Sequence, residues 1–546
     1  MSRTKRMRTG AQALVESLEK AGAQTVFGYP GGNVVDVFDY LRTSSLRFIL
    51  GRHEQGCVHM ADGYARALGR VGVAVVTSGP GLTNAITGLG TANIDGIPLL
   101  LICGQVPLNQ IGTDAFQESD TTGLTRAVTK HNFLVKRAAE IPQTVAEAFY
   151  IATHGKPGAV VIDIPKDVQE EMTSAEYPEK VVLRAYHPQR TPNKSDVKQL
   201  AAILNSAERP LIYAGGGVVS SESSEDVVAL ARKANIPIVT TMMGIGVING
   251  GDELSFGMSG VHGRCAANLA IATADVVLAL GVRFNDRATG GEGFPASGKS
   301  RFIHVDCDAS SIGKNVPVKM GVVADIKELL IALSPLVKEA SHEKWIAKLS
   351  AARAKGENKK KAISSNRGVS PADVVSCVRR HIGEDAVIVT DVGQHQLWAV
   401  KGLDNIRPRG LLASGGMGTM GFSMPAAIGA SIARPGCRVV SLVGDGGAQM
   451  TFEELVVAAE HSLPVLFIVF ENNTLGLVRQ MQLSRKGGRA FATEMRCPDF
   501  VKMASACGVR GFKATSLKKL EAAVAKAVKL SEPVLIEVSV DSEAQV

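Results

Sequence analysis

Short apolar runs alternate with amphipathic, helix-like stretches along almost the whole chain. Near-continuous apolar runs of this length are typical of strands that are buried on both faces of a parallel sheet. Because the runs alternate with helical stretches, the pattern predicts the α/β class, with three doubly wound parallel-sheet domains. The strand-like runs cover residues 71–77, 98–103, 158–164, 210–214, 236–240, 274–280, 301–305, 386–390, 438–444, 464–471 and 533–539.

Two polar stretches divide this pattern. Residues 187–193 are polar and include two prolines, which is typical of a linker. Residues 338–367 are charged and rich in Ala and Lys, which predicts a helix followed by an exposed linker. We therefore expect three domains of ordinary size. Their predicted limits are 1–186 for the N-terminal domain, 187–345 for the central domain and 346–546 for the C-terminal domain.

Polar residues follow two of the predicted strands in the C-terminal domain. Gly444-Asp445-Gly446 ends one apolar run, and Asn472 follows the next. Ligands of parallel sheets collect at the carboxyl ends of the strands, so we expect Asp445 and Asn472 to lie close together. A carboxylate and an amide oxygen suit a Mg²⁺ ion shared with a diphosphate, and glycines let the backbone approach phosphate oxygens. An ordinary strand–turn–helix connection remains the alternative, because Gly-Asp-Gly also occurs by chance.

A second candidate lies in the N-terminal domain at Arg52-His53-Glu54-Gln55-Gly56. This segment follows a strand-like run at 47–50 and opens an apolar helix. A partly buried glutamate at such a position suits proton-shuttle chemistry. The alternative is a solvent-facing carboxylate that is favoured by the helix dipole.

The motifs together resemble those of thiamine diphosphate enzymes. Gly28-Tyr-Pro-Gly-Gly32, His53-Glu54-Gln55, Thr77-Ser-Gly-Pro-Gly81, Gly444-Asp445-Gly446 and Asn472 occur in the order used by that group. The resemblance is closest to the catalytic large subunits of acetolactate synthase (acetohydroxyacid synthase), and it extends from about residue 10 to 542. Long segments carry it, namely 59–66, 104–107, 111–118, 130–135, 283–287, 391–396 and 418–421.

The resemblance implies that thiamine diphosphate and Mg²⁺ are cofactors. Glu54 would hydrogen-bond the aminopyrimidine ring, and Met420 would support the bent shape of the cofactor. The ligands of Mg²⁺ would be Asp445, Asn472 and Thr474. The other residues expected at this cofactor are Pro30, Gly31, Thr77, Pro80, Asn84, Gln394, His395, Gly418, Gly444, Gly446, Gly447, Gly476 and Leu477.

The implied reaction is the decarboxylation of pyruvate and the transfer of its two-carbon unit to a second 2-keto acid. It gives 2-acetolactate for branched-chain amino acid biosynthesis, with the thiazolium ring as electron sink. Gly32, Phe116 and Gln117 would lie beside the reacting atoms. Arg287 would hold the acceptor's carboxylate, and Met481 would shape the acceptor pocket.

The resemblance also implies that the central domain binds FAD without a net redox role. It implies further that the active site lies between two subunits, so we expect a homodimer or a tetramer. A small regulatory subunit is a candidate partner. The residues expected at FAD are Gly215, Gly216, Gly217, Thr241, Met242, His262, Gly263, Arg283, Asp306 and Asp325.

Three positions depart from the family's usual pattern. Met481 stands where Trp is usual, Val261 where Met is usual, and Asn33 where Ala is common. The first two changes remove bulk, so we expect a roomier acceptor pocket. A related carboligase acting on another keto acid or a diketone therefore stays open as an alternative. Intact Glu54 and Asp445 argue against a non-catalytic paralogue.

Composition excludes other classes of function. The chain has 546 residues and a net charge of +8, but Lys and Arg are dispersed apart from 359–361, so we expect a solvated basic surface and no nucleic-acid partner. No apolar run reaches the ~18–20 residues of a membrane helix. Eight scattered cysteines without Cys-x-x-Cys indicate reduced thiols in the cytoplasm and no zinc site. Gly416-x-Gly418-x-x-Gly421 follows no clean strand, which disfavours an NAD dehydrogenase.

Overall fold

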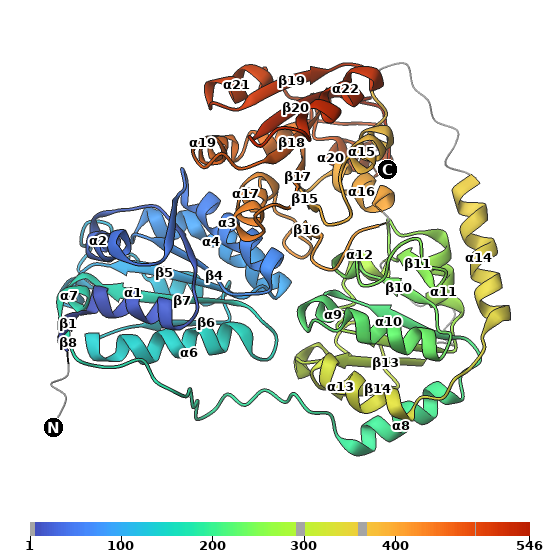
Figure 1. Ribbon diagram of the computed structural model, residues 1–546, viewed down its shortest axis with the longest axis horizontal. Coiled ribbons are helices and arrows are strands. Elements are labelled where there is room, and N and C mark those ends of the chain that lie inside the picture. The colour runs from blue at the N-terminus through green and yellow to red at the C-terminus, as the bar shows by residue number, and fades with distance from the viewer. Residues whose placement is uncertain (1–5, 291–300, 359–367, 404, 486) are drawn as a thin grey trace.

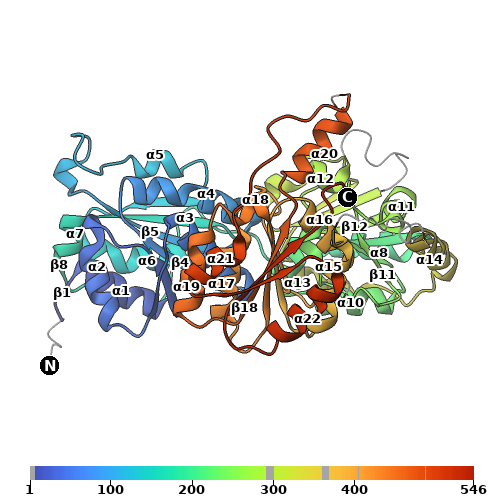
Figure 2. The same ribbon diagram turned by 90° about the horizontal axis from the view of Figure 1, so that it is seen from above.

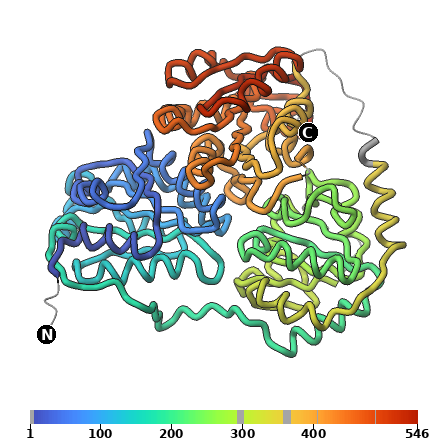
Figure 3. Tube along the Cα trace, viewed as in Figure 1, coloured from blue at the N-terminus to red at the C-terminus, as the bar shows by residue number. Residues whose placement is uncertain are grey.

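Three six-stranded sheets, in which every pair of neighbouring strands is parallel, form the framework of the molecule. The computed structural model describes residues 6–290, 301–358, 368–403, 405–485 and 487–546. Helices cover the sheets, and the three units meet at the centre of the molecule (Figure 1, Figure 3). The predicted α/β class with three parallel-sheet domains is confirmed.

The N-terminal sheet has the order β3-β2-β4-β5-β7-β6, and β1 (Arg8–Thr9) pairs with β8 (Met172–Thr173) outside it. Its strands are β3 (Arg47–Leu50), β2 (Thr25–Gly28), β4 (Gly72–Val76), β5 (Leu99–Gln105), β7 (Ala159–Pro165) and β6 (His131–Leu134). Its helices are α1 (Gly10–Lys20), α2 (Val35–Thr43), α3 (Glu54–Leu68), α4 (Pro80–Asp95), α5 (Thr121–Thr125), α6 (Ile141–Thr153) and α7 (Lys166–Glu170).

The central sheet has the order β11-β10-β9-β12-β13-β14. Its strands are β11 (Ser255–Met258), β10 (Ile238–Thr240), β9 (Pro210–Ala214), β12 (Val276–Leu280), β13 (Arg301–Asp306) and β14 (Met320–Val323). The helices nearby are α8 (Lys194–Asn205), α9 (Gly216–Ser220), α10 (Ser224–Lys233), α11 (Cys265–Thr273), α12 (Asp286–Thr289), α13 (Ile326–Leu333) and α14 (Glu343–Asn358). The helix expected within 338–367 is therefore α14, while the expected linker 359–367, with the basic run 359–361, lies outside the described residues.

The C-terminal sheet has the order β16-β15-β17-β18-β20-β19. Its strands are β16 (Leu411–Ala413), β15 (Val387–Thr390), β17 (Val439–Gly444), β18 (Val465–Glu471), β20 (Val534–Ser539) and β19 (Arg510–Ala514). Its helices are α15 (Pro371–His381), α16 (Gln394–Gly402), α17 (Ser423–Ala433), α18 (Asp445–Ala448), α19 (Leu455–Glu460), α20 (Gly476–Arg485), α21 (Phe500–Ala506) and α22 (Leu517–Ala527). Helix α20 projects from the molecule in Figure 2.

Strand order places the ligand sites of the three units. In the outer two sheets the first strand in sequence lies between the second and the third; in the central sheet it lies between the second and the fourth. The chain reverses direction across the sheet beside the first strand in each unit, and ligands bind at such switch points. In the C-terminal unit this point lies between β15 and β17. In the central unit it lies between β9 and β12, and the central order is that of dinucleotide-binding folds.

The N-terminal and C-terminal units share one apolar core through helices α3 and α17. A Cβ atom at Gly63 would lie 2.1 Å from the carbonyl oxygen of Ala426, and one at Gly429 would lie 1.9 Å from that of Met60. Only glycine permits these backbones to approach so closely. The residue numbers run in opposite directions along the contact, so the two helices are antiparallel.

Helix α3 begins at Glu54, within the segment that was expected to open a helix, and the ring of His53 accepts the N–H of Gln55 there at 3.1 Å. The helix is closed by Gly69, which has φ of 72°. One detail of the sequence analysis changes. The statement that no clean strand precedes Gly416 is wrong, because β16 ends at Ala413. That strand is a short edge strand, so it leaves little apolar signal. Among the described residues no helix has the length and apolar character that crossing a membrane requires.

Candidate active site

Asp445 lies at the carboxyl end of β17, where its carboxylate is almost completely buried. It accepts the backbone N–H groups of Asn472 and Asn473 at 2.9 and 2.7 Å, and that of Gly446 at 2.8 Å. Burial raises the pKa of Asp445, and these three hydrogen bonds oppose the rise. The structure thus brings Asp445 and Asn472 together, as the sequence predicts.

The three residues expected to bind Mg²⁺ are linked to one another by hydrogen bonds. The N–H of Thr474 donates to the side-chain oxygen of Asn472 at 3.2 Å, next to the carboxylate of Asp445. One carboxylate, one amide oxygen and one backbone carbonyl are hard ligands that leave positions open for water or phosphate oxygens, as Mg²⁺ requires. Within the described part of the chain no cluster of three or more His, Cys, Asp or Glu side chains could hold a metal ion.

Glycines surround His395 at the same edge of the sheet. A Cβ atom at Gly444 would lie 3.0 Å from its ring, and one at Gly393 would lie 2.8 Å away. The Nε2 atom of His395 is buried without a hydrogen-bond partner, and burial lowers its pKa to about 4. A neutral ring nitrogen without a partner beside open backbone fits an anionic oxygen, such as that of a diphosphate.

The remaining residues expected at the diphosphate also border this edge. Gly447 lies against the carboxylate of Asp391, where a Cβ atom would come within 2.5 Å. At Gly446 a Cβ atom would lie 3.2 Å from the methyl group of Met420. Gln394 is buried, and its amide group donates to Gln480 at 2.8 Å. Met420 therefore projects beside the predicted phosphate-binding glycines.

Glu54 begins helix α3, and its half-buried carboxylate has a defined partner. The side-chain amide of Asn84, on α4, donates to Oε2 of Glu54 at 2.9 Å. Pro80 occupies the first turn of α4, and a Cβ atom at Gly81 would lie 2.8 Å from the methyl group of Thr77. This contact with a second helix favours the functional interpretation of Glu54 over a carboxylate that faces solvent alone.

Glu54 and Asp445 lie toward opposite ends of the α3–α17 pair within one chain. The backbone N–H of Ser423, which begins α17, donates to Asp391 at 2.8 Å, and Gly447 of the Asp445 turn contacts the same carboxylate. Along α3, Glu54 precedes the Gly63 contact by nine residues, a rise of about 14 Å away from this end. One chain therefore does not bring its own Glu54 to its own Asp445.

A strained loop carries two of the predicted catalytic residues. Gln117 has φ of 62°, which is unusual for a residue with a side chain and is found where surrounding structure enforces it. Glu118 provides that enforcement, because its carboxylate accepts the N–H groups of Thr113 and Ala115 at 3.2 and 3.1 Å and also that of Gly112. Phe116 is 88% exposed. A Cβ atom at Gly79 would lie 3.0–3.1 Å from Gln117, so this loop lies on the turn before α4.

Gly32 follows β2, in a turn that contacts the turn before α4. It is exposed, with open space where a Cβ atom would stand. The preceding Gly31 contacts Thr77, where a Cβ atom would come within 2.5 Å. Asn33 donates its side-chain amide to Ser78 at 2.6 Å, which joins the two turns. Gly32 and the loop of Phe116 and Gln117 thus both border the turn before α4, and Pro30 lies in the same turn as Gly32.

A cavity of about 740 Å³ lies where the three units meet, at the switch point of the central sheet. Eight of the ten residues that were expected to bind FAD border this cavity, so most of the predicted set could contact one ligand. They are Gly216, Gly217, Thr241, Met242, His262, Arg283, Asp306 and Asp325. The other two, Gly215 and Gly263, pack against backbone instead, since Cβ atoms there would lie 2.1 Å from the Gly281 oxygen and 2.5 Å from the Ser259 carbonyl carbon. Gly418 and Leu477 also border the cavity.

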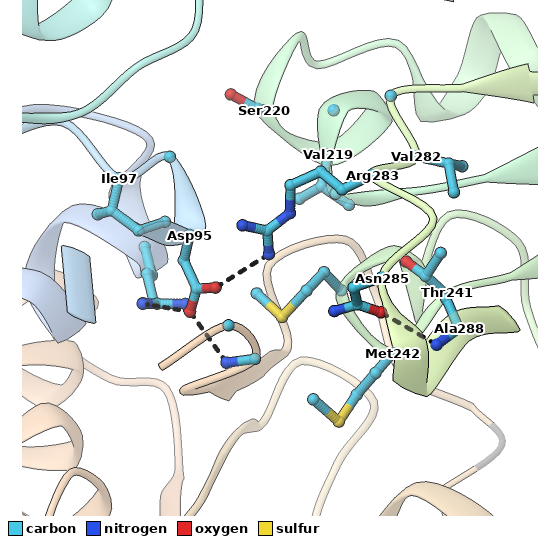
Figure 4. Close-up of a pocket in the computed structure, with 18 of the residues that line it drawn as sticks. Asp95, Ile97, Val219, Ser220, Thr241, Met242, Val282, Arg283, Asn285 and Ala288 are labelled. Carbon is cyan, nitrogen blue, oxygen red and sulfur yellow. Dashed lines mark hydrogen bonds and ion pairs between the residues drawn. The ribbon is translucent and has the colours of Figure 1, made fainter. Parts of the chain in front are cut away.

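The wall of this cavity contains a residue that sequence reasoning missed. Asp95, at the end of α4, accepts Arg66 at 3.1 Å, Arg283 of the central unit at 3.2 Å and the N–H of Gly415 in the C-terminal unit at 2.9 Å (Figure 4). Arg409 of the C-terminal unit also joins the three units, because its side chain donates to the carbonyls of Arg66 in the N-terminal unit and Val219 in the central unit. Its backbone has φ of 61°. No sequence motif contains Asp95. The one indication of a role is its position as an acidic residue at the end of an apolar helix, which is a weak signal.

The residues expected to bind the acceptor substrate form two groups. The N–H of Val261 donates to the carbonyl of Arg287 at 3.0 Å, and both side chains are at least half exposed. Arg287 borders the cavity, as does Leu477 on α20. Met481 lies one turn further along α20 and is half-buried. The two positions that depart from the family pattern thus lie on the central unit and on α20.

Known protein families match all three units. Thiamine pyrophosphate enzyme, N-terminal TPP binding domain, matches residues 8–124; the central domain of the same enzymes matches 197–333; and their C-terminal TPP binding domain matches 391–538. Relatives match over almost the full length. The acetolactate synthase large subunit of Haemophilus influenzae is 41% identical over 98% of this chain and 95% of its own. The probable acetolactate synthase large subunit of Methanocaldococcus jannaschii is 42% identical over 97% of this chain and 92% of its own. The acetolactate synthase large subunit of Corynebacterium glutamicum is 40% identical over 98% of this chain and 88% of its own.

Proposed function

This chain belongs to the acetolactate synthase large-subunit family of thiamine pyrophosphate enzymes, and we propose that it converts pyruvate and a second 2-keto acid into 2-acetolactate or its homologue. Pyruvate is decarboxylated, and its two-carbon unit is transferred to the acceptor. The enzyme is a thiamine diphosphate-dependent carboligase.

The arrangement of α3 and α17 is the observation that carries the detailed proposal. Glu54 and Asp445 point to the two ends of one cofactor, yet one chain places them at opposite ends of its helix pair. Two copies related by a twofold axis resolve this, because Glu54 of each copy can meet Asp445 of the other. We therefore propose that the chain works as a homodimer, or as a tetramer built from such dimers.

The C-terminal unit of each copy would hold the diphosphate through Mg²⁺. Asp445, the side-chain oxygen of Asn472 and the carbonyl of Thr474 supply three oxygen ligands, and phosphate oxygens and water complete the octahedron. Gly444 and Gly446 present backbone at close range, and the free Nε2 of His395 faces the same space. The Met420 side chain would support the cofactor's bend from the apolar side.

The N-terminal unit of the other copy would control the proton. Thiamine diphosphate supplies a thiazolium ring that serves as an electron sink for the loss of CO₂. Glu54 would hold the proton at the ring nitrogen of the aminopyrimidine, and Asn84 fixes the direction of that carboxylate at 2.9 Å. The strained loop would keep Gln117 and Phe116 beside the substrate, opposite Gly32.

We propose FAD as the occupant of the central cavity, without a net redox role. The strand order is that of dinucleotide-binding folds, and Gly216 and Gly217 follow β9 at the switch point. Arg283 borders the same space and suits an anionic ligand. Asp306 and Asp325 supply hydrogen-bond acceptors for hydroxyl groups of the ribityl and ribose type.

The acceptor preference is the least constrained part of the proposal. Arg287 would bind the carboxylate of the acceptor, next to Val261. Val261 and Met481 are smaller than the residues usual in this family, which supports a roomier pocket and keeps a larger keto acid or a diketone as a second candidate. The relatives are large subunits, so a small regulatory subunit is a candidate partner. Eight free cysteines fit the reducing cytoplasm that the sequence predicts.

Incubation of the purified protein with pyruvate, thiamine diphosphate, Mg²⁺ and FAD tests this function. Formation of acetolactate, with loss of activity when Mg²⁺ is chelated, is the expected result. Turnover of pyruvate to acetaldehyde alone, or turnover only of another keto acid, would favour the alternative carboligase. An absence of thiamine diphosphate binding would contradict both.

A further inference from the structure

Glu454 is a completely buried carboxylate at the contact between the N-terminal and C-terminal units of one chain. It is the last residue of the 3₁₀ turn Phe452–Glu454, between the Asp445 turn and α19. A glutamate is almost never buried to this extent unless partners stabilise it. Its partners therefore indicate what it does.

Those partners are the two residues that precede Glu54. Oε1 of Glu454 accepts the backbone N–H of Arg52 at 3.1 Å and that of His53 at 3.0 Å, and Oε2 accepts the N–H of Arg52 at 3.1 Å. Helix α3 begins at the next residue, so the carboxylate also lies at the positive end of a helix dipole. One side chain of the C-terminal unit thus holds the backbone from which Glu54 projects.

Gly56, which has no side chain, permits the contact between Glu454 and the start of α3. A Cβ atom there would lie 1.9 Å from Oε1 of Glu454, so any larger residue would displace the carboxylate. The helix start, the glycine and the buried acid form one arrangement. It connects residues that are about 400 positions apart in the sequence.

We propose that Glu454 is a positioning residue for Glu54, holding the start of α3 so that the Glu54 carboxylate keeps its productive direction. This inference rests on the proposed function, in which Glu54 holds the proton at the cofactor ring. Glu454 would act through the backbone of Arg52 and His53, which its carboxylate contacts. Because a small displacement of a catalytic group costs a large factor in rate, loss of this contact should be visible in turnover.

The charges around Glu454 make the contact dependent on pH. Burial raises the pKa of Glu454 to about 7, the backbone of Arg52 and of His53 lowers it, and the carboxylate of Glu453 raises it. The Arg52 guanidinium also favours the charged form, while the buried Cys57 thiol and Glu54 lie on the α3 side. The ionised carboxylate accepts all three hydrogen bonds. Protonation converts one oxygen into a donor, which faces an N–H group.

The test compares Glu454→Gln with Glu460→Gln. Glu460 is the matched control, because its half-exposed carboxylate pairs with the side chain of the same Arg52 at 2.7 Å. Amide hydrogen exchange of Arg52 and His53 is measured first, in the protein without cofactors. We expect exchange about tenfold faster or more in Glu454→Gln, since hydrogen bonds to a charged group are lost, and no change in Glu460→Gln.

Activity and its pH dependence are measured next. In Glu454→Gln we expect kcat to fall roughly 10- to 100-fold with little change in KM for pyruvate. The decline of wild-type kcat below the pKa of about 7 should also disappear in that variant and persist in Glu460→Gln. Exchange of the C2 proton of bound thiamine diphosphate should slow by the same factor as kcat.

Each outcome decides the proposal. Faster amide exchange with unchanged kcat and C2 exchange would show a purely structural role and overturn it. Wild-type protein that forms no acetolactate would instead overturn the proposed function, while the amide exchange still reports the contact. Should Glu454→Gln not fold, wild-type exchange at Arg52 and His53, corrected for its intrinsic pH dependence, must be slower above pH 7 than below it; equal protection would contradict the proposal.

Discussion

The backbone N–H of Val261 donates to the carbonyl of Arg287 at 3.0 Å, so the residue expected to bind the acceptor and one residue that departs from the family pattern form a single unit. If Arg287 binds the acceptor as proposed, a change of bulk at Val261 acts beside the acceptor's carboxylate. The second departure, Met481, lies on the facing helix α20, one turn from the cavity-lining Leu477.

Met481→Trp should shift the acceptor preference from pyruvate toward 2-ketobutyrate. The larger ring adds apolar surface against the longer alkyl chain, and one extra methylene in a pocket changes a rate ratio by roughly 10-fold. Competition between the two acceptors, with product analysis, measures the ratio. Arg485→Gln, at the exposed end of α20, is the control. An unchanged ratio in Met481→Trp would show that this position does not shape the pocket.

Asp95→Asn should weaken both the assembly of the three units and the retention of FAD. The fully buried Asp95 carboxylate accepts Arg66, Arg283 and the N–H of Gly415. Removal of its charge leaves the Arg283 guanidinium without this carboxylate and leaves Arg66 paired with Asp62 alone. Loss of one member of a buried ion pair costs about 3–5 kcal/mol. Thermal unfolding and the flavin content after gel filtration measure the effect. Asp252→Asn, which breaks a surface pair with Arg232, should change neither; equal losses in both variants would remove the special role of Asp95.

Asn84→Ala should lower kcat while thiamine diphosphate still binds. The amide of Asn84 directs the Glu54 carboxylate at 2.9 Å, and a methyl group cannot replace it. We expect a fall of roughly tenfold, the value of one well-placed hydrogen bond to a charged group. Steady-state kinetics together with a thiamine diphosphate titration separate the two effects. A variant that loses affinity but keeps kcat at saturation would contradict this role.

His395→Gln should reduce the loss of stability in acid. Burial lowers the folded-state pKa of His395 from 6.5 to about 4. A depressed pKa contributes stability that is present above pH 6.5 and is lost as the pH falls toward 4, because only the unfolded chain then takes up the proton. The full effect is about 3 kcal/mol. The free energy of unfolding of the cofactor-free protein, measured between pH 4 and pH 6.5, tests this prediction. His187→Gln, at an exposed histidine, is the control. Equal acid sensitivity of wild type and His395→Gln would contradict the lowered pKa of His395.

Local pattern predicted most of the framework. The apolar runs and the strand-like run at 47–50 located most of the strands of each sheet, because burial on both faces leaves a strong signal in the sequence. The strands that were missed are short, with three to five residues each, and all except β2 lie at the edge of a sheet, so they carry little apolar pattern: β2, β6, β11, β14, β16 and β19. Asp445 and Asn472 were placed together because each follows a strand that was expected to end at the same edge of a parallel sheet.

Contacts between the units could not be predicted in the same way. Asp95 meets Gly415, and Glu454 meets Arg52, across hundreds of residues. A hydrogen bond between distant segments depends on how whole units pack, and neither partner shows a periodic or local signal. The opposite placement of Glu54 and Asp445 along α3 and α17 likewise emerges only from the packed helices.

The most direct test of the account is whether Glu54 and Asp445 act together from two chains. Glu54→Gln and Asp445→Asn should each abolish acetolactate formation when purified alone. Co-expression of the two variants gives mixed dimers in which one site carries both native residues and the other carries neither. With equal amounts and random pairing, half of the dimers are mixed and we expect about one quarter of wild-type acetolactate formation. A mixture as inactive as each variant alone would contradict the account, because it would place Glu54 and Asp445 of the same chain in one site.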